Sequence, residues 1–399
     1  MADTVVEPAI EKGLEPERRE QGDVRTEEML VNMGPQHPST HGVLRVVLRT
    51  DGELVLDAIP HIGYLHRCAE KIGESLPPYQ YIPYTDRMDY LAGMNNNQAF
   101  AIAVERLCGI EVPPRAQAIR VIFSEFNRIA SHLVALGTYG LDMGAFTPFL
   151  YAFREREMIL DLFEAACGAR LTYSYPTVGG VRSDLPDGWV ERCLEFLEYF
   201  EPKIDDYNNL LSFNHIFVKR ASNVGVISRE DAIAFGLTGP ILRASGVRWD
   251  LRKVQPYDGY EKYDFDVPIG EPGGVGDTPR GVVVGDCWNR YFVRVLEMIQ
   301  SIRIMRQALA ELPDGDIMAK KVKNLKLPVG EVYVEVENPR GQLGFYVLGD
   351  GSAIPARVKA RGPSFCNLSI IRHVARDVLL ADVPAIIGSF DVVMGEVDR

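Results

Sequence analysis

The stretch Ala116-Gln-Ala-Ile-Arg-Val-Ile-Phe-Ser-Glu-Phe-Asn-Arg-Ile-Ala-Ser-His-Leu-Val-Ala-Leu136 decides the fold class of this chain. Its large apolar residues recur every three or four positions, which is the spacing of residues on one face of an α-helix. They are Ile119, Ile122, Phe126, Ile129, Leu133 and Leu136. The stretch therefore predicts a long helix from near Ala116 to Leu136.

Three further long helices are expected downstream. Thr147-Pro148 is a good helix start and Gly168 a good stop, so one helix should fill the space between them. Amphipathic patterns predict two more, over 189–200 and 286–312. The region 237–285 is rich in Gly, Pro and Tyr and indicates ordered irregular structure.

Strand patterns stand at both ends of the chain. The N-terminal strands are expected at 29–33, 43–48 and 53–57, with a hairpin at Asp51-Gly52, and the C-terminal strands at 331–336, 343–348 and 356–359. The expected fold class is α+β, mainly α: a helical bundle with small β elements at the N- and C-terminal ends.

Four segments follow from these patterns. Residues 1–28 hold nine acids and four bases with few large apolar side chains, which predicts a disordered acidic tail. We expect a β-rich N-terminal subdomain at 29–85, a helical core at 86–326 and a β-containing C-terminal subdomain at 327–399. The last residues, 389–399, stay apolar and glycine-spaced, so the C-terminus should be buried in the fold.

Composition excludes several classes of protein. The 399 residues carry a net charge of −12, which argues against a nucleic-acid binder because phosphate contacts need a basic face. No apolar run reaches the ~18 residues that a membrane span needs. No N-terminal secretion signal is visible, so we expect the chain to stay in the cytoplasm.

The six cysteines lie far apart, at 68, 108, 167, 193, 287 and 366. No CxxC pair exists, so the chain lacks the usual frameworks for zinc or an iron–sulfur cluster. We expect all six to be buried, reduced and small apolar residues.

A loop with two prolines and flanking glycines, residues 34–42, carries His37 and His41. These flanks forbid a helix, so the two imidazoles are not a pair of zinc ligands on one helical face. A stiff loop suits a site that must present an imidazole in fixed geometry. The alternative is that both are turn residues bonded to local backbone, and His61 and His66 are at least as consistent with a structural role.

Two further places hold candidate charges. In the stretch 84–90, Arg87 could form a plain surface ion pair with Asp86 or Asp89, the favoured interpretation without context. Asp142 stands alone among small and apolar residues and needs a partner, so it is a functional candidate, with helix capping as the alternative. The glycines at 270–276 fit no nucleotide-binding pattern, so hydride transfer from this chain is not expected.

Seven motifs in one order together resemble a known family. They are 34–42 (Gly-Pro-Gln-His-Pro-Ser-Thr-His-Gly), 86–90 (Asp-Arg-Met-Asp-Tyr), 120–122, 128–133, 153–157, 242–247 and 394–399 (Met-Gly-Glu-Val-Asp-Arg). Over residues 28–399 the chain resembles the 49-kDa-type subunit of respiratory complex I, the proton-pumping NADH:quinone oxidoreductase. The resemblance implies a fold similar to the large subunit of [NiFe] hydrogenases.

The implied similarity to hydrogenases also indicates that this chain binds no metal. Asp89 and Ala92 stand where the first motif of hydrogenases has thiolates, and Val393, Glu396 and Arg399 replace the ligands of the second. These side chains cannot build a soft thiolate site. The resemblance therefore implies that the former metal cavity is part of a quinone pocket.

The resemblance also assigns roles to individual residues. His41 and Tyr90 would contact the quinone head group and supply protons as it is reduced, and Val393 would line the pocket. Asp142 would pair with His41 and hold its ring. Arg87 would lie near the terminal [4Fe–4S] cluster of the neighbouring subunit and tune its potential without ligating it.

Partners and location follow from the same resemblance. The implied partners are the terminal-cluster subunit, a subunit of the C type, a ferredoxin-like two-cluster subunit and the membrane subunit through which quinone enters. The chain would sit peripherally on the cytoplasmic face of the bacterial cell membrane. Two alternatives stay open: the equivalent subunit of a complex fed by ferredoxin or another donor, and a non-catalytic hydrogenase-like scaffold.

The chain departs from the family pattern in two places. Cys68 follows His66-Arg67 where the family usually has glycine. Thr172 and Thr177 replace a histidine and an arginine associated with the surroundings of the terminal cluster. We hypothesise that the cluster therefore titrates with weaker pH coupling and at a lower potential, which would suit menaquinone.

Overall fold

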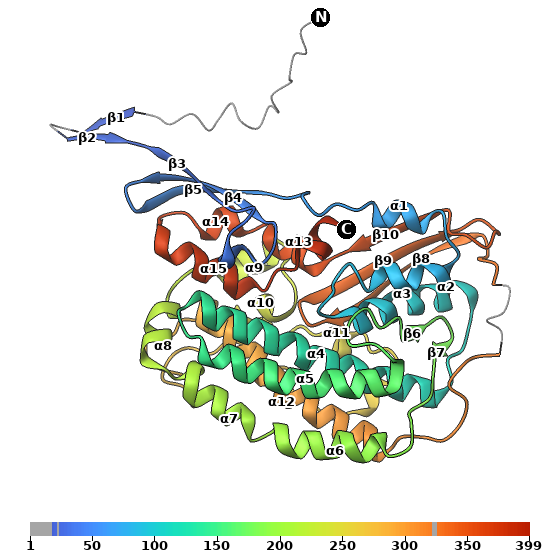
Figure 1. Cartoon of the computed structure of the whole chain (residues 1–399). Helices are drawn as coiled ribbons and strands as arrows, with labels where there is room; N and C mark the ends of the chain where they lie inside the picture. The colour runs from blue at the N-terminus through green and yellow to red at the C-terminus, as the bar shows by residue number, and fades with distance from the viewer. Residues whose placement is uncertain (1–17, 22–23, 321–324) are drawn as a thin grey trace, which may run out of the picture.

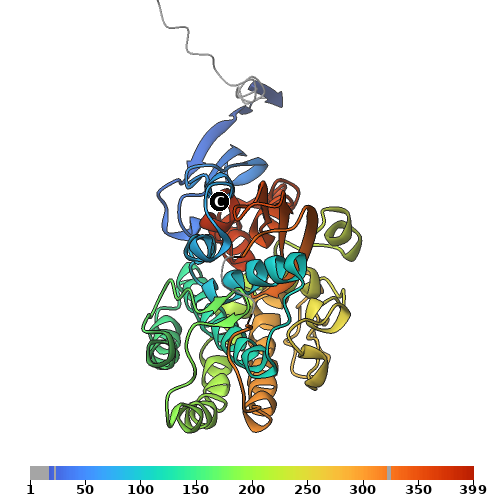
Figure 2. The same cartoon turned by 90° about the vertical axis from the view of Figure 1, so that its right-hand side faces the viewer.

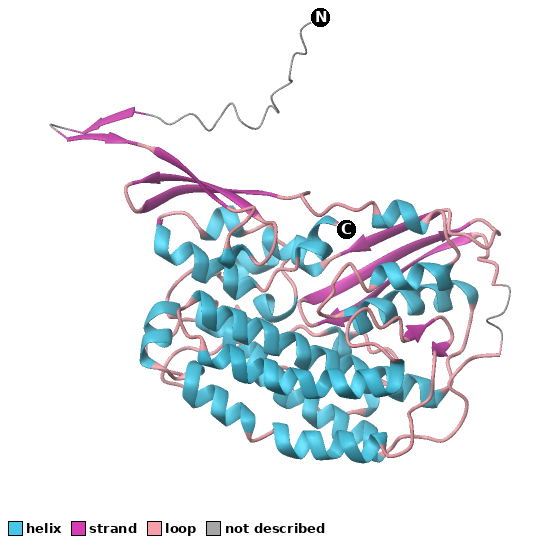
Figure 3. Cartoon of the chain, in the orientation of Figure 1, coloured by secondary structure: helices cyan, strands magenta, loops and turns pink. Residues whose placement is uncertain are grey.

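A computed structural model describes residues 18–21, 24–320 and 325–399 of the chain. Within these residues a bundle of long helices lies beneath two separate sheets (Figures 1 and 3). The view turned by 90° shows the N-terminal strands above the bundle. The C-terminus lies between these strands and the helices (Figure 2). The predicted class, α+β and mainly α, is confirmed.

The bundle is built around α4 (Pro114–Asp142), against which α5 (Thr147–Cys167) and α12 (Cys287–Ala310) pack. The helix α6 (Trp189–Phe200) has the predicted bounds and packs against α5. The side chain of Asp286 caps α12 by accepting a hydrogen bond from the Asn289 N–H at 2.8 Å. Gly168 ends α5 with a φ of 76°, a conformation that glycine adopts without a steric penalty.

The central helix continues past its predicted end at Leu136. The two glycines that follow, Gly137 and Gly140, do not end the helix but allow close packing. A Cβ at Gly137 would lie 3.1 Å from the Cα of Phe149, and a Cβ at Gly140 would lie 3.2 Å from the Ala145 carbonyl oxygen. These glycines let α5 and its leading loop approach α4 closely. The helix therefore continues through them as far as Asp142.

The N-terminal sheet has the strand order β11-β5-β4-β3 and is antiparallel throughout. Its strands are β3 (Met29–Met33), β4 (Arg45–Asp51), β5 (Leu54–His61) and β11 (Val378–Leu379). Gly52, with a φ of 58°, makes the predicted hairpin between β4 and β5. The edge strand β11 comes from the far end of the sequence, so the C-terminal part of the chain completes this sheet.

The second sheet has the order β10-β9-β8, with β8 (Gly330–Asn338), β9 (Gly341–Gly349) and β10 (Arg357–Arg361). The helix α3 (Gly93–Cys108) packs against β8 and β9. The predicted strands are thus confirmed, with longer bounds.

The remaining elements are short. The helices are α1 (Ala69–Gly73), α2 (Pro78–Thr85), α7 (Lys203–Tyr207), α8 (His215–Ala221), α9 (Arg229–Ala234), α10 (Gly239–Ala244), α11 (Leu251–Val254), α13 (Pro363–Leu368), α14 (Ile371–Val374), α15 (Val383–Phe390) and α16 (Met394–Asp398). The 3₁₀ or π turns are η2 (Pro38–Thr40), η3 (Asn208–Ser212), η4 (Tyr260–Lys262) and η5 (Leu380–Asp382), and β6 (Pro176–Thr177) pairs with β7 (Gly180–Val181).

The structure differs from the expected disordered tail. Residues 1–17 and 22–23 lie outside the described residues, but β1 (Arg18–Gln21) and β2 (Val24–Glu27) pair as antiparallel strands. A two-stranded ribbon of this size is marginal in water, and the charged composition gave no signal for it. The segmentation at residues 85 and 326 stays a prediction, and the β11–β5 and α3–β8 contacts cross it.

The apolar periodicity indicated one buried face on α4, but the helix also buries ionisable side chains. Arg120, Glu125, Arg128 and His132 are fully buried. Glu125 accepts hydrogen bonds from Arg252 at 3.1 Å, from Ser301 at 2.6 Å and from Tyr260 at 2.7 Å. A buried charge is tolerated only when it is paired and hydrogen-bonded, so these contacts are a condition of the fold.

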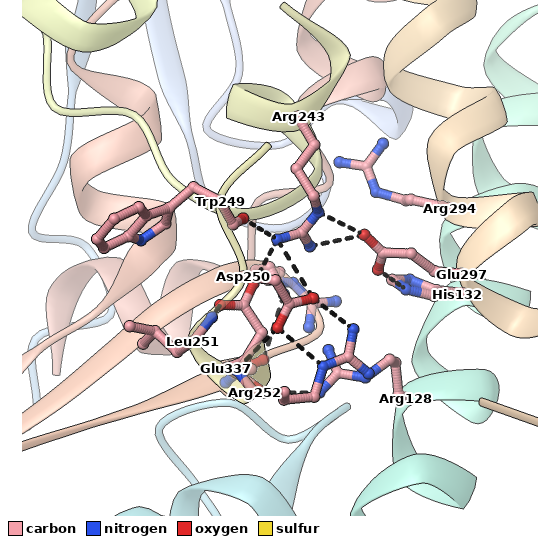
Figure 4. A network of polar contacts seen from close by, with 12 residues as sticks. Arg128, His132, Arg243, Trp249, Asp250, Leu251, Arg252, Arg294, Glu297 and Glu337 are labelled. Atoms are coloured by element: carbon pink, nitrogen blue, oxygen red, sulfur yellow. Dashed lines mark hydrogen bonds and ion pairs between the residues drawn. The ribbon is translucent and has the colours of Figure 1, made fainter. Parts of the chain in front are cut away.

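Figure 4 shows the continuation of this network away from α4. The His132 Nε2 atom lies 2.9 Å from Glu297 of α12, and Arg243 of α10 binds Glu297 at 2.6 Å and Glu337 of β8 at 2.8 Å. Burial alone would raise the pKa of Glu297, but Arg243 and His132 outweigh burial and hold that pKa well below its usual value. The Arg243 side chain thus joins three elements distant in sequence.

We predict that Arg243→Met destabilises the protein by roughly 3–5 kcal/mol, because it leaves the buried Glu297 and Glu337 carboxylates without their shared cation. The exposed Arg170 also binds three carboxylates, those of Glu157, Asp161 and Glu164, and provides a matched control. Arg170→Met should barely change the thermal unfolding midpoint followed by circular dichroism. Equal midpoints for the two variants would contradict this account.

Candidate functional site

The 34–42 loop holds its two imidazoles differently. The His37 Nδ1 atom accepts a hydrogen bond from the Ser39 N–H at 3.2 Å and caps η2, which agrees with the turn interpretation. His41 ends η2 with a φ of 50°, a left-handed conformation that aims its side chain away from the turn's own backbone. His41 has a partner that is distant in sequence.

That partner is Asp142, the last residue of α4. The His41 Nε2 atom lies 2.6 Å from Asp142 Oδ2, and their side chains are 12% and 6% exposed. Ionised partners at this distance form a charge-assisted hydrogen bond. Asp142 thus has a partner 101 positions away in sequence and does not act as a helix cap.

The 84–90 turn contradicts the expected surface ion pair. Asp86 and Asp89 are fully buried, and Asp86 Oδ2 accepts hydrogen bonds from the N–H and hydroxyl of Ser174 at 2.9 and 2.8 Å. Asp89 is bound by Arg340 at 2.9 Å. Arg87 is exposed and donates to the Pro83 carbonyl at 2.5 Å, because the better partners for both carboxylates come from distant segments.

Tyr90 follows directly and is partly buried. Burial and the neighbouring Asp89 carboxylate raise the pKa of Tyr90, so its phenol keeps its proton at neutral pH. Among the described residues no side chain or backbone group hydrogen-bonds its hydroxyl. The hydroxyl thus keeps its proton and has no hydrogen-bond acceptor among the described residues.

The last residues of the chain connect the His41 loop to the Tyr90 turn. Residues 392–398 are buried, as expected for this end of the chain. The side chain of Met394 lies 3.4 Å from the position of a Cβ on Gly42, next to His41. A Cβ on Gly395 would lie 2.7 Å from the Met88 carbonyl, in the Tyr90 turn. The His41 loop and the Tyr90 turn therefore both contact residues 394–395.

Hydrogen bonds fix this C-terminal segment. The carboxylate of Asp398 accepts from the N–H groups of Gly63 and Leu65 at 2.8 Å, and the Asp398 carbonyl lies 2.7 Å from Nδ1 of His66. His66 thus has the structural role considered for it. Val393 is 2% exposed and is the N-cap residue of α16. Its N–H donates a hydrogen bond to the Ser364 hydroxyl at 3.3 Å.

Arg340 is a site residue that sequence reasoning missed. It binds Asp89 at 2.9 Å and Asp391 at 3.3 Å, so it joins the Tyr90 turn to the segment that holds Val393. It stands in the Asn338-Pro-Arg-Gly341 turn between β8 and β9. Nothing in the sequence around it indicates that its partners lie 251 and 51 positions away.

Glu396 lies close to Asp89 and Asn338, and sequence reasoning missed its raised pKa. It is fully buried, accepts from the Ser364 N–H at 2.9 Å and lies 3.5 Å from Asn338, which also binds Asp89. Burial and the nearby Asp89 carboxylate raise the pKa of Glu396 to about 8. Asp89 and Glu396 are thus close together, and Glu396 carries a proton at neutral pH.

Thr172 and Thr177 are the two positions at which a histidine and an arginine of the family pattern are replaced. Thr172 has a φ of 53°, and Ser174, two residues on, binds Asp86 beside Arg87. The carbonyl of the buried Thr177 accepts from Arg120 at 2.7 Å. The segment that contains both threonines therefore lies against the turn that carries Arg87.

The cysteines are all free thiols, but the expectation that all are buried is wrong. Cys193 and Cys287 are buried, three others are partly exposed, and Cys68 is exposed with a φ of 57°. Cys68 occupies the left-handed N-cap of α1, a position that favours glycine. In the part of the chain that the structure describes, no group of three or more His, Cys, Asp or Glu side chains has the arrangement of a metal site.

The raised pKa of Glu396 predicts a pH effect on stability. The folded chain keeps this proton up to about pH 8, whereas the unfolded chain loses it near 4.5, so stability falls as pH rises through this window. Glu396→Gln cannot ionise and should lose less stability between pH 5 and 8.5 than the wild type. Thermal unfolding midpoints across this range test it, with Glu191→Gln on the exposed side of α6 as control. Parallel pH curves for Glu396→Gln and wild type would contradict the prediction.

Comparison with known proteins agrees with the family resemblance found in the sequence. A family model described as "Respiratory-chain NADH dehydrogenase, 49 Kd subunit" matches residues 142–326 and 320–399. An NADH-quinone oxidoreductase subunit of Desulforamulus reducens is 52% identical over 375 residues, which are 94% of this chain and 99% of that protein. The subunit of the same name from Bacillus cereus is 50% identical over 376 residues, 94% of this chain and 100% of the relative.

A third relative, again an NADH-quinone oxidoreductase subunit of that name, comes from Chlorobium luteolum. It is 52% identical over 381 residues, 94% of this chain and 95% of that protein. The family model matches the chain from residue 142 to its last residue, and each of the three relatives covers 94% of the chain. The chain therefore belongs to the family of the 49-kDa subunit of the respiratory-chain NADH dehydrogenase.

Proposed function

We propose that this chain is the quinone-site subunit of a membrane-bound NADH:quinone oxidoreductase, coupled to proton translocation. It binds the quinone head group and supplies protons as electrons arrive from the terminal [4Fe–4S] cluster of a neighbouring subunit. The His41–Asp142 pair, 2.6 Å apart and next to the segment that reaches the Tyr90 turn, is the observation that carries the proposal.

The chemistry of quinone reduction needs such groups. The two carbonyl oxygens of a quinone become basic as two electrons are added, and each then takes a proton. Tyr90 offers a phenol that stays protonated, and His41 offers an imidazole held in place by a carboxylate. Val393 directly precedes Met394 and Gly395, which contact the His41 loop and the Tyr90 turn, and it is proposed to contact the head group.

The remaining assignments concern partners and place. The partners are proposed to be the terminal-cluster subunit, the C-type subunit, the two-cluster ferredoxin-like subunit and the membrane subunit that admits quinone, on the cytoplasmic face of the cell membrane. None of the helices in the described ranges is both long and apolar enough to cross a bilayer. Exposed Phe146, Leu150 and Tyr151 follow Asp142 directly and support a protein contact near the site.

We predict that Tyr90→Phe lowers the turnover of NADH:quinone reduction by roughly 10²-fold, because it removes a hydroxyl donor to the developing charge. The complex should still assemble and reduce ferricyanide, which accepts electrons upstream. Tyr84→Phe, at an exposed tyrosine six residues earlier, should keep full activity. Full quinone turnover in Tyr90→Phe would refute the assignment.

Thr172 gives a second test, since Ser174, two residues after it, binds Asp86 beside Arg87. A β-branched residue is strained at a φ of 53°, whereas histidine and asparagine tolerate this conformation. Thr172→His should raise the midpoint potential of the partner's terminal cluster and make it more pH-dependent, because a titrating imidazole is added. Thr172→Asn fits the backbone but carries no proton to titrate.

Redox titration of the purified complex at several pH values, followed by electron paramagnetic resonance, measures this effect. The Thr172→Asn complex should titrate like the wild type. An unchanged pH dependence in Thr172→His would remove the proposed link between this position and the cluster.

A further inference from the structure

The short helix α15 packs against both elements that carry the His41–Asp142 pair, namely η2 and α4. Its residue Gly388 faces the pair directly. A Cβ built on Gly388 would lie 2.7 Å from Asp142 Oδ2 and 2.8 Å from the Cδ2 atom of Tyr139. Both distances are shorter than any comfortable carbon contact, so position 388 has no room for a side chain.

The backbone itself does not require glycine at this position. Gly388 lies inside a helix and is absent from the glycines with positive φ. Glycine in a helix interior costs about 1 kcal/mol of helix stability relative to alanine. Space for the neighbouring side chains, and not chain conformation, is thus the physical reason for glycine here.

Of the two neighbours, the carboxylate is the one that would yield to a methyl group. The Tyr139 ring is 2% exposed and packs against Phe217 and Tyr291, with ring centroids 5.6 and 6.0 Å away. Asp142 Oδ2, in contrast, is the end of a short side chain. The same oxygen atom is the one that lies 2.6 Å from His41 Nε2.

The imidazole cannot simply follow a displaced carboxylate. His41 has a left-handed backbone conformation, and Gly42 after it, with a φ of 125°, packs against Met394. The backbone that carries the ring is therefore held in place by its own conformation and by Met394. A shift of Asp142 would lengthen the hydrogen bond between the two residues.

We propose that Gly388 is a positioning residue for quinone reduction: its missing side chain leaves the space in which the Asp142 carboxylate is held against His41. Gly388 acts only through Asp142 and touches no substrate. This inference rests on the proposed role of the His41–Asp142 pair.

A double-mutant cycle on the assembled complex tests it. Gly388→Ala should lower kcat for NADH:quinone reduction roughly 10- to 100-fold with little change in KM, because a small misplacement of a catalytic group has effects of this size. Ferricyanide reduction should be unchanged. In the Asp142→Ala background, where no carboxylate remains to be displaced, Gly388→Ala should cause no further loss.

Gly137→Ala is the matched control, since it adds a methyl group to α4 at 3.1 Å from Phe149, away from the pair. Its kcat per assembled complex should equal the wild-type value. A kcat loss for Gly388→Ala that persists in the Asp142→Ala background, or no loss at all, overturns the positioning role.

Two other outcomes are also decisive. If Asp142→Ala keeps full turnover, the proposed function of the pair fails, and the inference fails with it. If Gly388→Ala does not assemble, the double variant decides: assembly restored by Asp142→Ala supports a clash with the carboxylate, and continued failure overturns it.

Discussion

Pairing of ionised side chains inside the helical bundle is the constraint on which this structure depends. The central helix α4 buries Arg120, Glu125, Arg128 and His132 completely, so each must meet a partner from another element. Those partners come from α3, α11, α12 and β8. Removing one partner of a buried ion pair costs far more than removing a surface pair. The network therefore specifies which elements surround α4 and in which register.

The same principle builds the candidate site. Arg340 binds Asp89 beside Tyr90 and Asp391 beside Val393, so one guanidinium sets the distance between the two halves of the proposed quinone pocket. The His41–Asp142 pair fixes the end of α4 to the N-terminal loop. Charge pairing thus positions the groups that are proposed to move protons.

The helix positions could be predicted from local patterns, since capping residues and apolar periods act within a few residues. The bounds of α6 and the cap of α12 at Asp286 show this. Long-range partners could not be predicted in this way. Arg87 was expected to pair with its sequence neighbours, but Arg340, 251 positions from Asp89, occupies that place. The contact between His41 and Asp142 came from the family resemblance, and Gly388 gave no signal because a helical glycine has many explanations.

The edge strand β11 and the residues after it have a consequence for biosynthesis. The N-terminal sheet, whose other strands end at His61, lacks its edge until Val378 has left the ribosome, and the contacts of Met394 and Gly395 with the His41 loop and the Tyr90 turn form later still. A nascent chain can therefore bury its helical bundle early, whereas the proposed quinone pocket closes only when translation is nearly complete. Until those last residues have been made, the His41 loop and the Tyr90 turn lack their contacts with Met394 and Gly395 and stay exposed.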